Sequence, residues 1–373
     1  MPSFDIVKKA TPEKTYRVSA VLSAFDLDIE KVREQFTGSI DVEGKDWSVG
    51  LIVGASGTGK TTIAKEVFPD SYIFEQIYGA KSVIDDMPEN KSIKEITKAF
   101  TSVGFASPPS WLKPYSVLSN GEKMRCDLAK AILDEKDLIV FDEFTSVVNR
   151  EVAKTGSFAI QKAVRKTGKK FIAVACHSDI IEWLQPDWIY NTDEQRFFFC
   201  SGEYKRPNIE IQVFRVSNEH KKQVWEIFRK YHYLNTDLHQ AAEQWVGIMN
   251  GQLVCHRGII QFPMRKGWKR GHRMVVLPDY QGIGIGTAFE NYTSKHYADL
   301  GWNINITTTT PALVHALCRD KNWRLVRKGR TNSNWNDFSI YGTKQDKQHE
   351  RAQNHLLKTL SNKRITYSFN YKR

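Results

Sequence analysis

The sequence has 373 residues, of which 41% are hydrophobic and 26% charged, an ordinary globular balance with room for two domains. No apolar run approaches the roughly 18–20 residues of a membrane-spanning helix, which excludes transport through the same chain. The first residues lack the apolar core of a signal peptide. Five scattered cysteines, without a C-x-x-C pair, argue against a disulfide framework or a zinc site and predict a cytoplasmic protein: Cys126, Cys176, Cys200, Cys255 and Cys318.

Positive charge is concentrated in the second half of the chain. From residue 206 to the end there are 27 Lys and Arg against 12 Asp and Glu, whereas the preceding residues carry a small acidic excess. A basic field of this kind favours a polyanionic partner, nucleic acid first. The alternative is a basic surface that serves solubility alone. No membrane partner is expected.

The chain opens with short predicted elements that lead to a glycine-rich loop. Residues 16–22 alternate apolar and polar side chains, which is typical of a strand. Residues 28–36 have a helical pattern, with Asp28 as the expected N-cap. A continuous apolar run at 49–53 predicts a buried strand, and residues 61–67 predict a helix.

The segment between this strand and this helix fits G-x-x-x-x-G-K-[ST] and predicts a triphosphate site. Its glycines would let backbone N–H groups cradle phosphate oxygens at the positive end of a helix. Lys60 would reach the β- and γ-phosphates, while the Thr61 hydroxyl would hold Mg²⁺. The candidate ATP-binding residues of the loop are Gly54, Ser56, Gly57, Gly59, Lys60, Thr61 and Thr62.

A short strand and a helix are predicted after the loop. Residues 71–76 predict an apolar strand that ends at Gln76, and residues 91–103 predict a helix. Pro108 and Pro109 then interrupt the chain. The interval is too short for a long coiled-coil arm, so we expect a compact helical lobe.

Three more patterns come in a fixed order. Leu-Ser-Asn-Gly-Glu at 118–122 precedes a predicted helix at 126–133. An apolar strand then ends in Asp142 and Glu143, and residues 171–177 form another apolar strand that ends in a histidine. With the glycine loop, this order resembles the ABC-type ATPases, whose signature loop, Walker B strand and switch histidine these segments match.

The resemblance implies a role for each matching residue near the γ-phosphate. Asp142 would hold Mg²⁺ through water, with Thr61 and Gln76 as further metal-site residues. Glu143 would be the general base that orients the attacking water, and His177 would contact the γ-phosphate.

The signature residues Ser119 and Gly121 would act on the ATP of a second copy. In this family the signature works in trans, because two heads sandwich two nucleotides. The resemblance therefore implies a homodimer formed through the ATPase heads.

The sequence departs from the family pattern in three places. Asn120 and Glu122 replace Gly and Gln in the signature, Phe144 stands where Pro often follows the Walker B strand, and Asn149 replaces an Asp of the dimer-contact loop. These departures favour a slow, ATP-gated clamp over a fast motor.

The second half starts a new series of elements after a predicted linker at 201–207. In chain order we expect a strand at 209–216, a helix at 218–231, strands at 241–247 and 252–262, and a basic loop at 264–272.

A second glycine-rich segment, LPDYQGIGIG, holds Q-x-x-G-x-G between a strand and a predicted helix at 287–299. Bare amides at the helix N-terminus would face a pyrophosphate. The segment resembles the acyl-CoA loop of GNAT acetyltransferases. A Rossmann fold competes, but no ribose-binding acid follows a next strand. The candidate acyl-CoA-binding residues are Val275, Val276, Leu277, Gln281, Gly282, Ile283, Gly284, Ile285, Gly286 and Thr287.

The elements after this loop complete a GNAT-like order. They are a strand at 303–308, a helix at 312–320 and a final strand near 338–341. Residues 346–373 predict a basic tail with a short helix.

The candidate acyl-transfer residues depart from the usual GNAT pattern. GNAT enzymes often carry a tyrosine in the last helix as general acid for the CoA thiolate, and by spacing that position is Cys318 here. His232 is a candidate base near neutral pH, and Tyr233 stands next to it. The alternative is that both pack at the end of a helix.

The whole order resembles one family of ABC-type ATPases fused to a predicted acetyltransferase domain, found in archaea, bacteria and phages. Its GNAT half is distantly similar to the phage Mom enzymes, which modify adenine in DNA. The expected fold is α/β, with an ABC-type P-loop ATPase head and a short helical lobe at 1–203. An α+β GNAT acyltransferase domain would follow at 204–345.

The expected function is ATP-dependent modification of nucleic acid, in which an ABC dimer clamps DNA and the GNAT half moves an acyl group to a base amine. ATP, Mg²⁺ and acetyl-CoA or another acyl-CoA would be the cofactors. Two alternatives stay open: a nucleotide-gated binding module with a degenerate GNAT half, and an acetyltransferase for protein or aminoacyl-tRNA.

Overall fold

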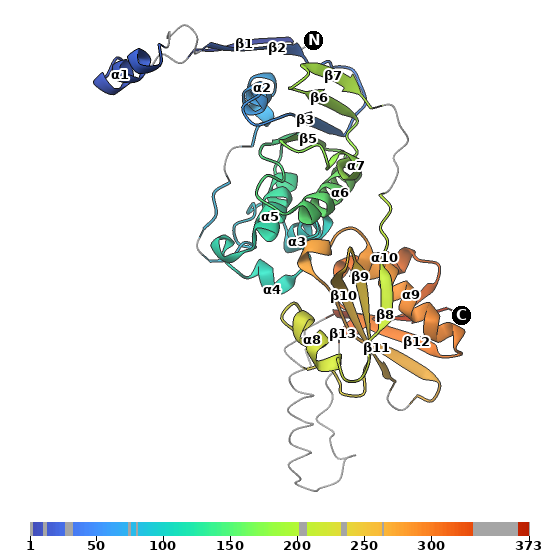
Figure 1. Cartoon of the computed structure of the whole chain (residues 1–373). Coiled ribbons are helices and arrows are strands. Elements are labelled where there is room, and N and C mark those ends of the chain that lie inside the picture. The colour runs from blue at the N-terminus through green and yellow to red at the C-terminus, as the bar shows by residue number, and fades with distance from the viewer. Residues whose placement is uncertain are drawn as a thin grey trace. The chain divides into compact units, whose positions relative to one another are not determined.

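The computed structural model describes residues 3–9, 13–26, 33–73, 76–79, 81–200, 207–232, 237–262, 265–330 and 365–372. These residues form a mixed α/β structure (Figure 1) that divides into two compact units. The first unit holds residues 1–77 and 134–207, and the second holds residues 78–133 and 208–373.

A five-stranded sheet forms the centre of the first unit. Its strands are β3 (Val49–Val53), β4 (Leu138–Phe141), β5 (Lys170–Ala175), β6 (Trp188–Asn191) and β7 (Arg196–Phe199). The order is β4-β5-β3-β6-β7, and only β7 is antiparallel to its neighbour. Every residue of β3 is buried, because helices cover both faces of a sheet of this kind.

Helices pack on both sides of this sheet. They are α2 (Lys60–Val67), α6 (Arg150–Thr167) and α7 (Ile181–Leu184). Figure 1 shows α2 on one face and α6 with α7 on the other. Ile63 and Ala64 of α2 join a buried cluster with Ile52, Ile172 and Trp188. The predicted strand and helix on either side of the glycine loop are thus confirmed.

Two secondary-structure predictions for the first 40 residues were wrong, because a predicted strand is a helix and part of a predicted helix is a strand. The predicted strand at 16–22 lies in helix α1 (Tyr16–Phe25), which Thr15 caps by accepting a hydrogen bond from Val18 N at 3.3 Å. Part of the predicted helix at 28–36 lies in strand β2 (Arg33–Ser39), which pairs antiparallel with β1 (Ser3–Lys9). The pairing partner of β2 is remote in sequence, so the local pattern did not reveal it.

The predicted strand at 71–76 is largely absent from the described residues. Pro69–Ser71 form a 3₁₀ turn, and Tyr72 makes an isolated bridge with Val140 of β4. Phe74 and Glu75 lie outside the described residues.

The second unit begins with the helical lobe. Its helices are α3 (Ile93–Ser102), α4 (Pro108–Trp111) and α5 (Asn120–Leu133). Tyr78 stacks on Tyr115 at 3.9 Å between ring centroids, and each tyrosine hydroxyl donates to Asp127 of α5 at 2.7 Å. The predicted compact lobe is therefore present, and it clusters with residues from the second half of the chain.

A seven-stranded sheet forms the rest of this unit. Its strands are β8 (Gln212–Arg215), β9 (Glu243–Met249), β10 (Gln252–Gln261), β11 (Trp268–Val276), β12 (Asn303–Thr308), β13 (Trp323–Arg330) and β14 (Ile365–Tyr371). The order is β13-β14-β12-β11-β10-β9-β8, and among the neighbouring pairs only β11 and β12 are parallel.

Three helices complete the unit: α8 (Lys221–Arg229), α9 (Ile285–Asp299) and α10 (Pro311–Arg319). Helix α9 connects the parallel strands β11 and β12. Arg257 of β10 is fully buried and fixes α9, since it pairs with Glu290 and donates to the Ser294 hydroxyl at 3.0 Å.

Two predictions for this half need correction. The expected basic loop at 264–272 includes the first half of β11. The expected basic tail includes β14, which lies between β12 and β13, with Phe369 fully buried. Its run of alternating apolar residues is short and flanked by Lys and Arg, so the segment was interpreted as a basic tail and not as a strand. The expected strand at 338–341 lies outside the described residues.

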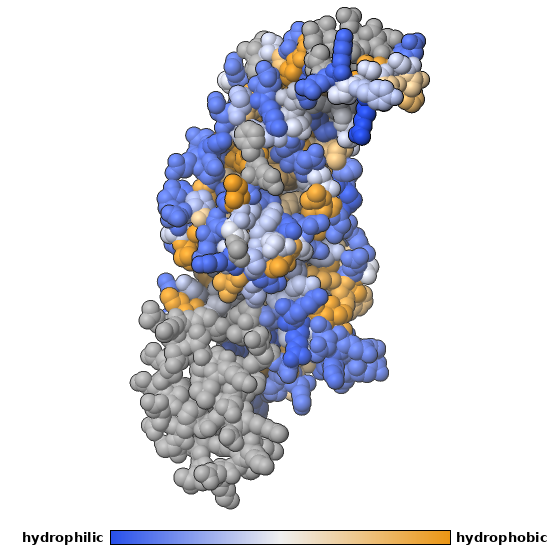
Figure 2. Space-filling view, turned by 90° about the vertical axis from the view of Figure 1, so that its left-hand side faces the viewer, coloured by the Kyte–Doolittle hydropathy of each residue, from blue (hydrophilic) through white to orange (hydrophobic). Residues whose placement is uncertain are grey.

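Among the described residues, no helix is long and apolar enough to cross a membrane. On the face shown in Figure 2, hydrophilic residues predominate and hydrophobic ones form small separate groups. The most exposed apolar side chains of the lobe are Ile93, Leu112 and Val117.

Candidate functional site

Three predicted ATP-site segments leave the first sheet at one edge. β3 ends at Val53 before the glycine loop, β4 ends before Asp142, and β5 ends two residues before His177. The strands are adjacent and parallel, with Val53 opposite Ala175. Because carboxyl ends of parallel strands meet at the same edge, the loop, the carboxylates and His177 are brought together.

The glycine loop has the backbone that a phosphate cradle requires. Gly57 and Gly59 have φ of 87° and 83°, and Gly59 is the N-cap of α2. A Cβ on Gly54 would lie 2.1 Å from Thr192 Oγ1, so only glycine fits there. Ser56 is exposed, whereas Lys60, Thr61 and Thr62 at the start of α2 are partly buried. In this conformation Lys60 Nζ donates to Ala55 O at 2.5 Å.

A tyrosine that sequence reasoning missed positions the carboxylate of Asp142. The hydroxyl of Tyr72 donates to Asp142 Oδ2, and Glu143 N donates to Asp142 Oδ1 at 2.8 Å. Burial, followed by the bond to Asp142, raises the pKa of Tyr72 well above its usual value, so its hydroxyl stays a donor. Glu143 itself has φ of 50°, a left-handed conformation that is uncommon for a side chain of this kind.

The metal residues predicted for Mg²⁺ supply oxygen atoms only. Thr61 and Asp142 come from the two segments that meet at the sheet edge, and Gln76 follows Tyr72 by four residues. The described residues contain no group of three or more His, Cys, Asp and Glu that could hold a metal by themselves. This set fits Mg²⁺, which binds through one or two carboxylates together with substrate phosphates and water.

The predicted signature residues Ser119 and Gly121 lie in the second unit at the start of α5. Glu122 N donates to Ser119 Oγ at 3.3 Å, and Ser119 N donates to Glu122 Oε2 at 3.0 Å. This is a capping box, so the departure at Glu122 has a structural purpose. Gly121 is buried.

The other two departures also have local roles. Phe144 is fully buried and packs edge-on against Phe141 and Phe171. Asn149 caps α6, because its Oδ1 accepts a hydrogen bond from Val152 N at 2.9 Å. Each substitution therefore stabilises the fold at its own position.

The predicted acyl-CoA loop ends at the N-terminus of α9, which is 15 residues long. Gly282 and Gly284 have φ of 87° and 97°, and a Cβ on Gly284 would have no atom within 4 Å. Ile283 and Ile285 are buried as core residues. The loop can therefore present backbone amides, but not these two side chains, to a ligand.

Strands β11 and β12 separate beside this helix end. Their ladder covers only Trp268 to Arg270, whereas β11 continues to Val276 in pairing with β10. A bulge follows at His272, which has no opposite residue on β10.

The remaining candidate acyl-CoA residues lie in β11, just after it, or in α9. Val275 is buried in the core with Trp225 and Phe228, and Leu277 N donates to Val254 O at 2.9 Å. The carbonyl oxygen of Val276 accepts a hydrogen bond from Gln281 Nε2 at 2.9 Å. Gly286 and Thr287 lie in the first turn of α9.

Four histidines gather near the bulge, of which the sequence predicted only His232. His256 Nε2 donates to Gln244 Oε1 at 3.0 Å, and His239 N donates to His272 Nε2 at 3.2 Å. Burial lowers the pKa of both His256 and His272 to about 3; the charge of His232 contributes at His256, and that of Arg273 contributes at His272. Both are thus neutral imidazoles near pH 7. Tyr233 lies outside the described residues.

Cys318, which the spacing predicts at the position of the GNAT tyrosine, is an exposed free thiol on α10. Its neighbour Leu317 is buried.

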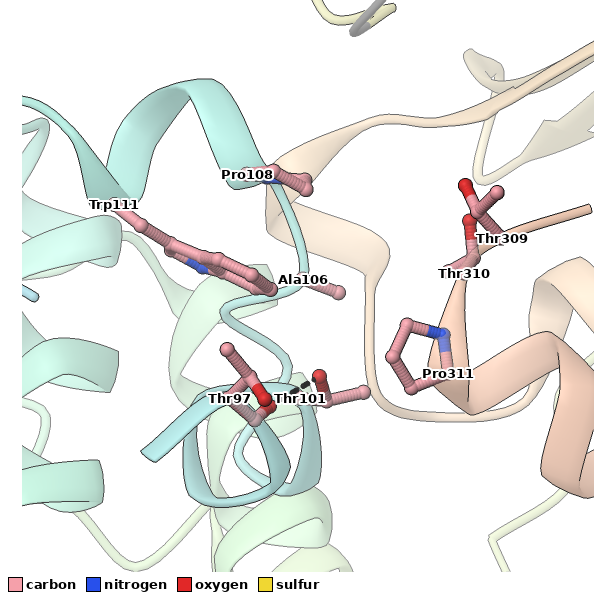
Figure 3. A pocket seen from close by; sticks show the side chains of 8 residues that line it. All are labelled: Thr97, Thr101, Ala106, Pro108, Trp111, Thr309, Thr310 and Pro311. Carbon is pink, nitrogen blue, oxygen red and sulfur yellow. Dashed lines mark hydrogen bonds between the residues drawn. The ribbon is translucent and has the colours of Figure 1, made fainter. Parts of the chain in front are cut away.

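A cavity of about 240 Å³ lies between the lobe and the start of α10. Figure 3 shows Trp111 and Pro108 on one side and Thr309, Thr310 and Pro311 on the other. Sequence reasoning missed it, because its two walls are about 200 residues apart.

Comparison with known proteins gives partial matches. No family model matches the sequence. A segment of 174 residues is 30% identical to the ABC multidrug transporter atrD of Emericella nidulans, and covers 44% of this chain but 12% of the transporter. This chain thus spans a small part of the curated relative it matches.

Two kinds of solved structure align with parts of the chain. The IAA acetyltransferase from Bacillus cereus aligns over 44% of this chain and 100% of its own, with 12% identity and a TM-score of 0.30. CbiO1 from Clostridium perfringens, part of the ABC transporter complex cbiONQ, aligns over 45% and 81%, with 19% identity and a TM-score of 0.35. Alignments with such TM-scores do not establish a fold, so each assignment depends on the motifs and the strand arrangement.

Proposed function

We propose that this protein is an ATP-dependent enzyme that transfers an acyl group from acetyl-CoA or another acyl-CoA to an amine on a nucleic-acid base, with DNA favoured over RNA. The ABC-type heads of two copies would bind ATP and close as a clamp. The GNAT-like half would perform the transfer. The distant similarity to the phage Mom enzymes and the domain boundaries at 203 and 345 stay predictions.

The separation of β11 and β12 beside the start of α9 carries the transferase proposal. Beyond Arg270, β11 has no ladder partner on the β12 side among the described residues. Amides of a pantetheine arm can pair with such a strand in the way a peptide adds to a sheet edge. The N-terminus of α9, with Gly284 open to solvent, suits the pyrophosphate of CoA.

The transfer would proceed through attack of the amine nitrogen on the thioester carbonyl carbon. The C–S bond breaks, CoA leaves as a thiolate, and the amine loses a proton to a base while the thiolate gains one. His232 is the candidate base, and its ring lies against Trp225, which also contacts the ring of His256. A nucleobase inside a duplex is out of reach of the enzyme, so closure of the clamp would have to open the duplex or flip the nucleobase out.

The ATPase half would act through the sheet edge described above. Lys60 would bind the terminal phosphates, and Glu143 would orient the attacking water. Thr61, Gln76 and Asp142 would hold Mg²⁺, which neutralises charge on the phosphates. Tyr72 would keep Asp142 in position through its hydrogen bond.

The charge distribution supports a nucleic-acid partner. β13 is an edge strand of the second sheet, and its side chains Arg324, Arg327 and Lys328 are exposed. Such residues also protect an edge strand from aggregation. The salt dependence of nucleic-acid binding tests whether these residues also contact phosphates.

Mass analysis of nucleosides tests the proposal. Purified protein, ATP, Mg²⁺ and isotopically labelled acetyl-CoA are incubated with duplex DNA, and in a parallel reaction with RNA. The expected result is a labelled acetyl-nucleoside that requires ATP. The proposal fails if neither nucleic acid gains label, although the protein binds acetyl-CoA.

A nucleotide-gated binding module is the second candidate, and the exposed Cys318 favours it, since the usual acid is missing. A degenerate GNAT half should bind no acyl-CoA in a titration, which separates the two candidates. The third alternative, acylation of a protein or an aminoacyl-tRNA, would be supported by label on those substrates and disfavoured by salt-sensitive duplex binding.

A further inference from the structure

We propose that Arg125 is a positioning residue that ties the acyl-CoA loop to the ATPase signature helix, so that the binding of acyl-CoA and of ATP is coupled. The inference rests on the function proposed above. Arg125 lies on α5, the helix that starts directly after Ser119. Its side chain donates to the carbonyl oxygens of Pro278 at 2.8 Å and Asp279 at 2.9 Å.

The burial of Arg125 makes this contact specific. The residue is 1% exposed, and burial lowers its pKa to about 10, so the guanidinium remains charged at neutral pH. A buried charge is tolerated only where hydrogen bonds compensate its lost hydration. Two backbone carbonyls within the predicted acyl-CoA loop, just before its glycines, supply part of that compensation, and the planar guanidinium holds both at once.

A second contact connects the lobe to the same loop. Gln281 Oε1 accepts a hydrogen bond from Ala106 N at 3.0 Å, while its Nε2 donates to Val276 O at 2.9 Å. Gly104, with φ of 84°, lets the chains approach closely, because a Cβ there would lie 2.6 Å from Gln281 O. The side chain of Gln281 is thus used for the lobe contact rather than left for a ligand.

One rigid element therefore meets both ligand sites. A nucleotide that touches Ser119 or Gly121 acts on the first turn of α5, and Arg125 on the next turn holds the entry to the acyl-CoA loop. Packed helices transmit displacement as units. If both ligands bias the position of α5, each must change the affinity of the other by the same factor.

The coupling is measured by titrating acetyl-CoA into the full chain with and without ATP and Mg²⁺, in an E143Q background that slows hydrolysis. We expect ATP to change the acetyl-CoA Kd by about fivefold or more, within the usual range of allosteric coupling. Acetyl-CoA should change the ATP Kd by the same factor. In R125Q the factor should fall below about twofold, with R125K between them, because lysine keeps the charge but lacks the fork geometry.

Asp127→Asn is the matched control. Asp127 lies on the same helix, but its carboxylate accepts hydrogen bonds from Tyr78 and Tyr115 within the lobe. Asp127→Asn should lower the stability of the unit and leave the coupling factor intact. If R125Q does not fold, Gln281→Met removes the second contact and should also lower the factor.

The outcomes separate this inference from the proposed function. Acetyl-CoA binding that ATP does not change, or full coupling in both R125Q and Gln281→Met, would overturn the coupling and leave acyl transfer standing. Failure of the E143Q protein to bind acetyl-CoA under any condition would overturn both.

Discussion

At the scale of single residues, Glu143 is the predicted general base of ATP hydrolysis. Its backbone N–H donates a hydrogen bond to the carboxylate of Asp142, and the residue lies two positions after the end of β4. We expect E143Q to lower kcat for ATP hydrolysis by about 100-fold or more, because loss of a general base costs that much. The Kd for ATP should stay within about twofold. Glu66→Gln, on the exposed side of α2, should change neither; equal loss in both variants would contradict the assignment.

The buried His256 predicts a pH-dependent stability. Its pKa falls from 6.5 in the unfolded chain to about 3 in the folded chain through burial and the charge of His232. Between these values the unfolded state binds more protons, so the free energy of unfolding falls as pH falls through this window. Protonation would also place a donor at Nδ1, which has no partner among the described residues.

Urea unfolding of the wild type and of H256Q measures this effect. From pH 7 to pH 5, the wild type should lose about 2 kcal/mol more than H256Q, the amount that one such group contributes. His272 and the carboxylates titrate in both proteins and cancel in the difference. Parallel pH profiles would show that His256 stays solvated.

At the scale of elements, two ends of α9 provide a matched test of the acyl-CoA loop. Gly284 before α9 and Gly301 after it both have positive φ, 97° and 86°, and open space around a Cβ. G284A and G301A should each cost about 1–2 kcal/mol of stability.

Only Gly284→Ala should weaken acetyl-CoA binding, by about tenfold or more, because displaced amides lose charge-assisted hydrogen bonds. Calorimetric titration of both variants measures this difference. Equal acetyl-CoA affinities would argue against a ligand at this helix end.

At the scale of the whole molecule, the resemblance to ABC-type ATPases implies a dimer that forms on ATP binding. E143Q should sediment as a monomer without nucleotide and as a dimer with ATP and Mg²⁺. Ser119→Arg should prevent dimer formation by crowding the signature, while Ser102→Arg, elsewhere in the lobe, should not. A dimer that forms equally without ATP would contradict the clamp.

Nucleic-acid binding is tested through its salt dependence. Replacing Arg324, Arg327 and Lys328 by glutamine should reduce the slope of log Kd against log salt by about 2–3, since each phosphate contact contributes about 0.9. The same change at the exposed Lys14, Lys94 and Lys98 alters net charge equally and should leave the slope nearly unchanged. Equal effects would indicate a general charge field without a defined site.

The sequence by itself determined the parts of this protein that depend on neighbours along the chain. The glycine loops before α2 and α9 and the buried strand β3 were predicted, because backbone freedom and apolar periodicity are local properties. It did not determine contacts between remote segments. Tyr72 on Asp142, β14 between β12 and β13, and Arg125 on the loop before Gln281 were decided by the tertiary structure. Hydrogen-bond partners so far apart in sequence leave no periodic pattern, and only the folded chain brings them within reach.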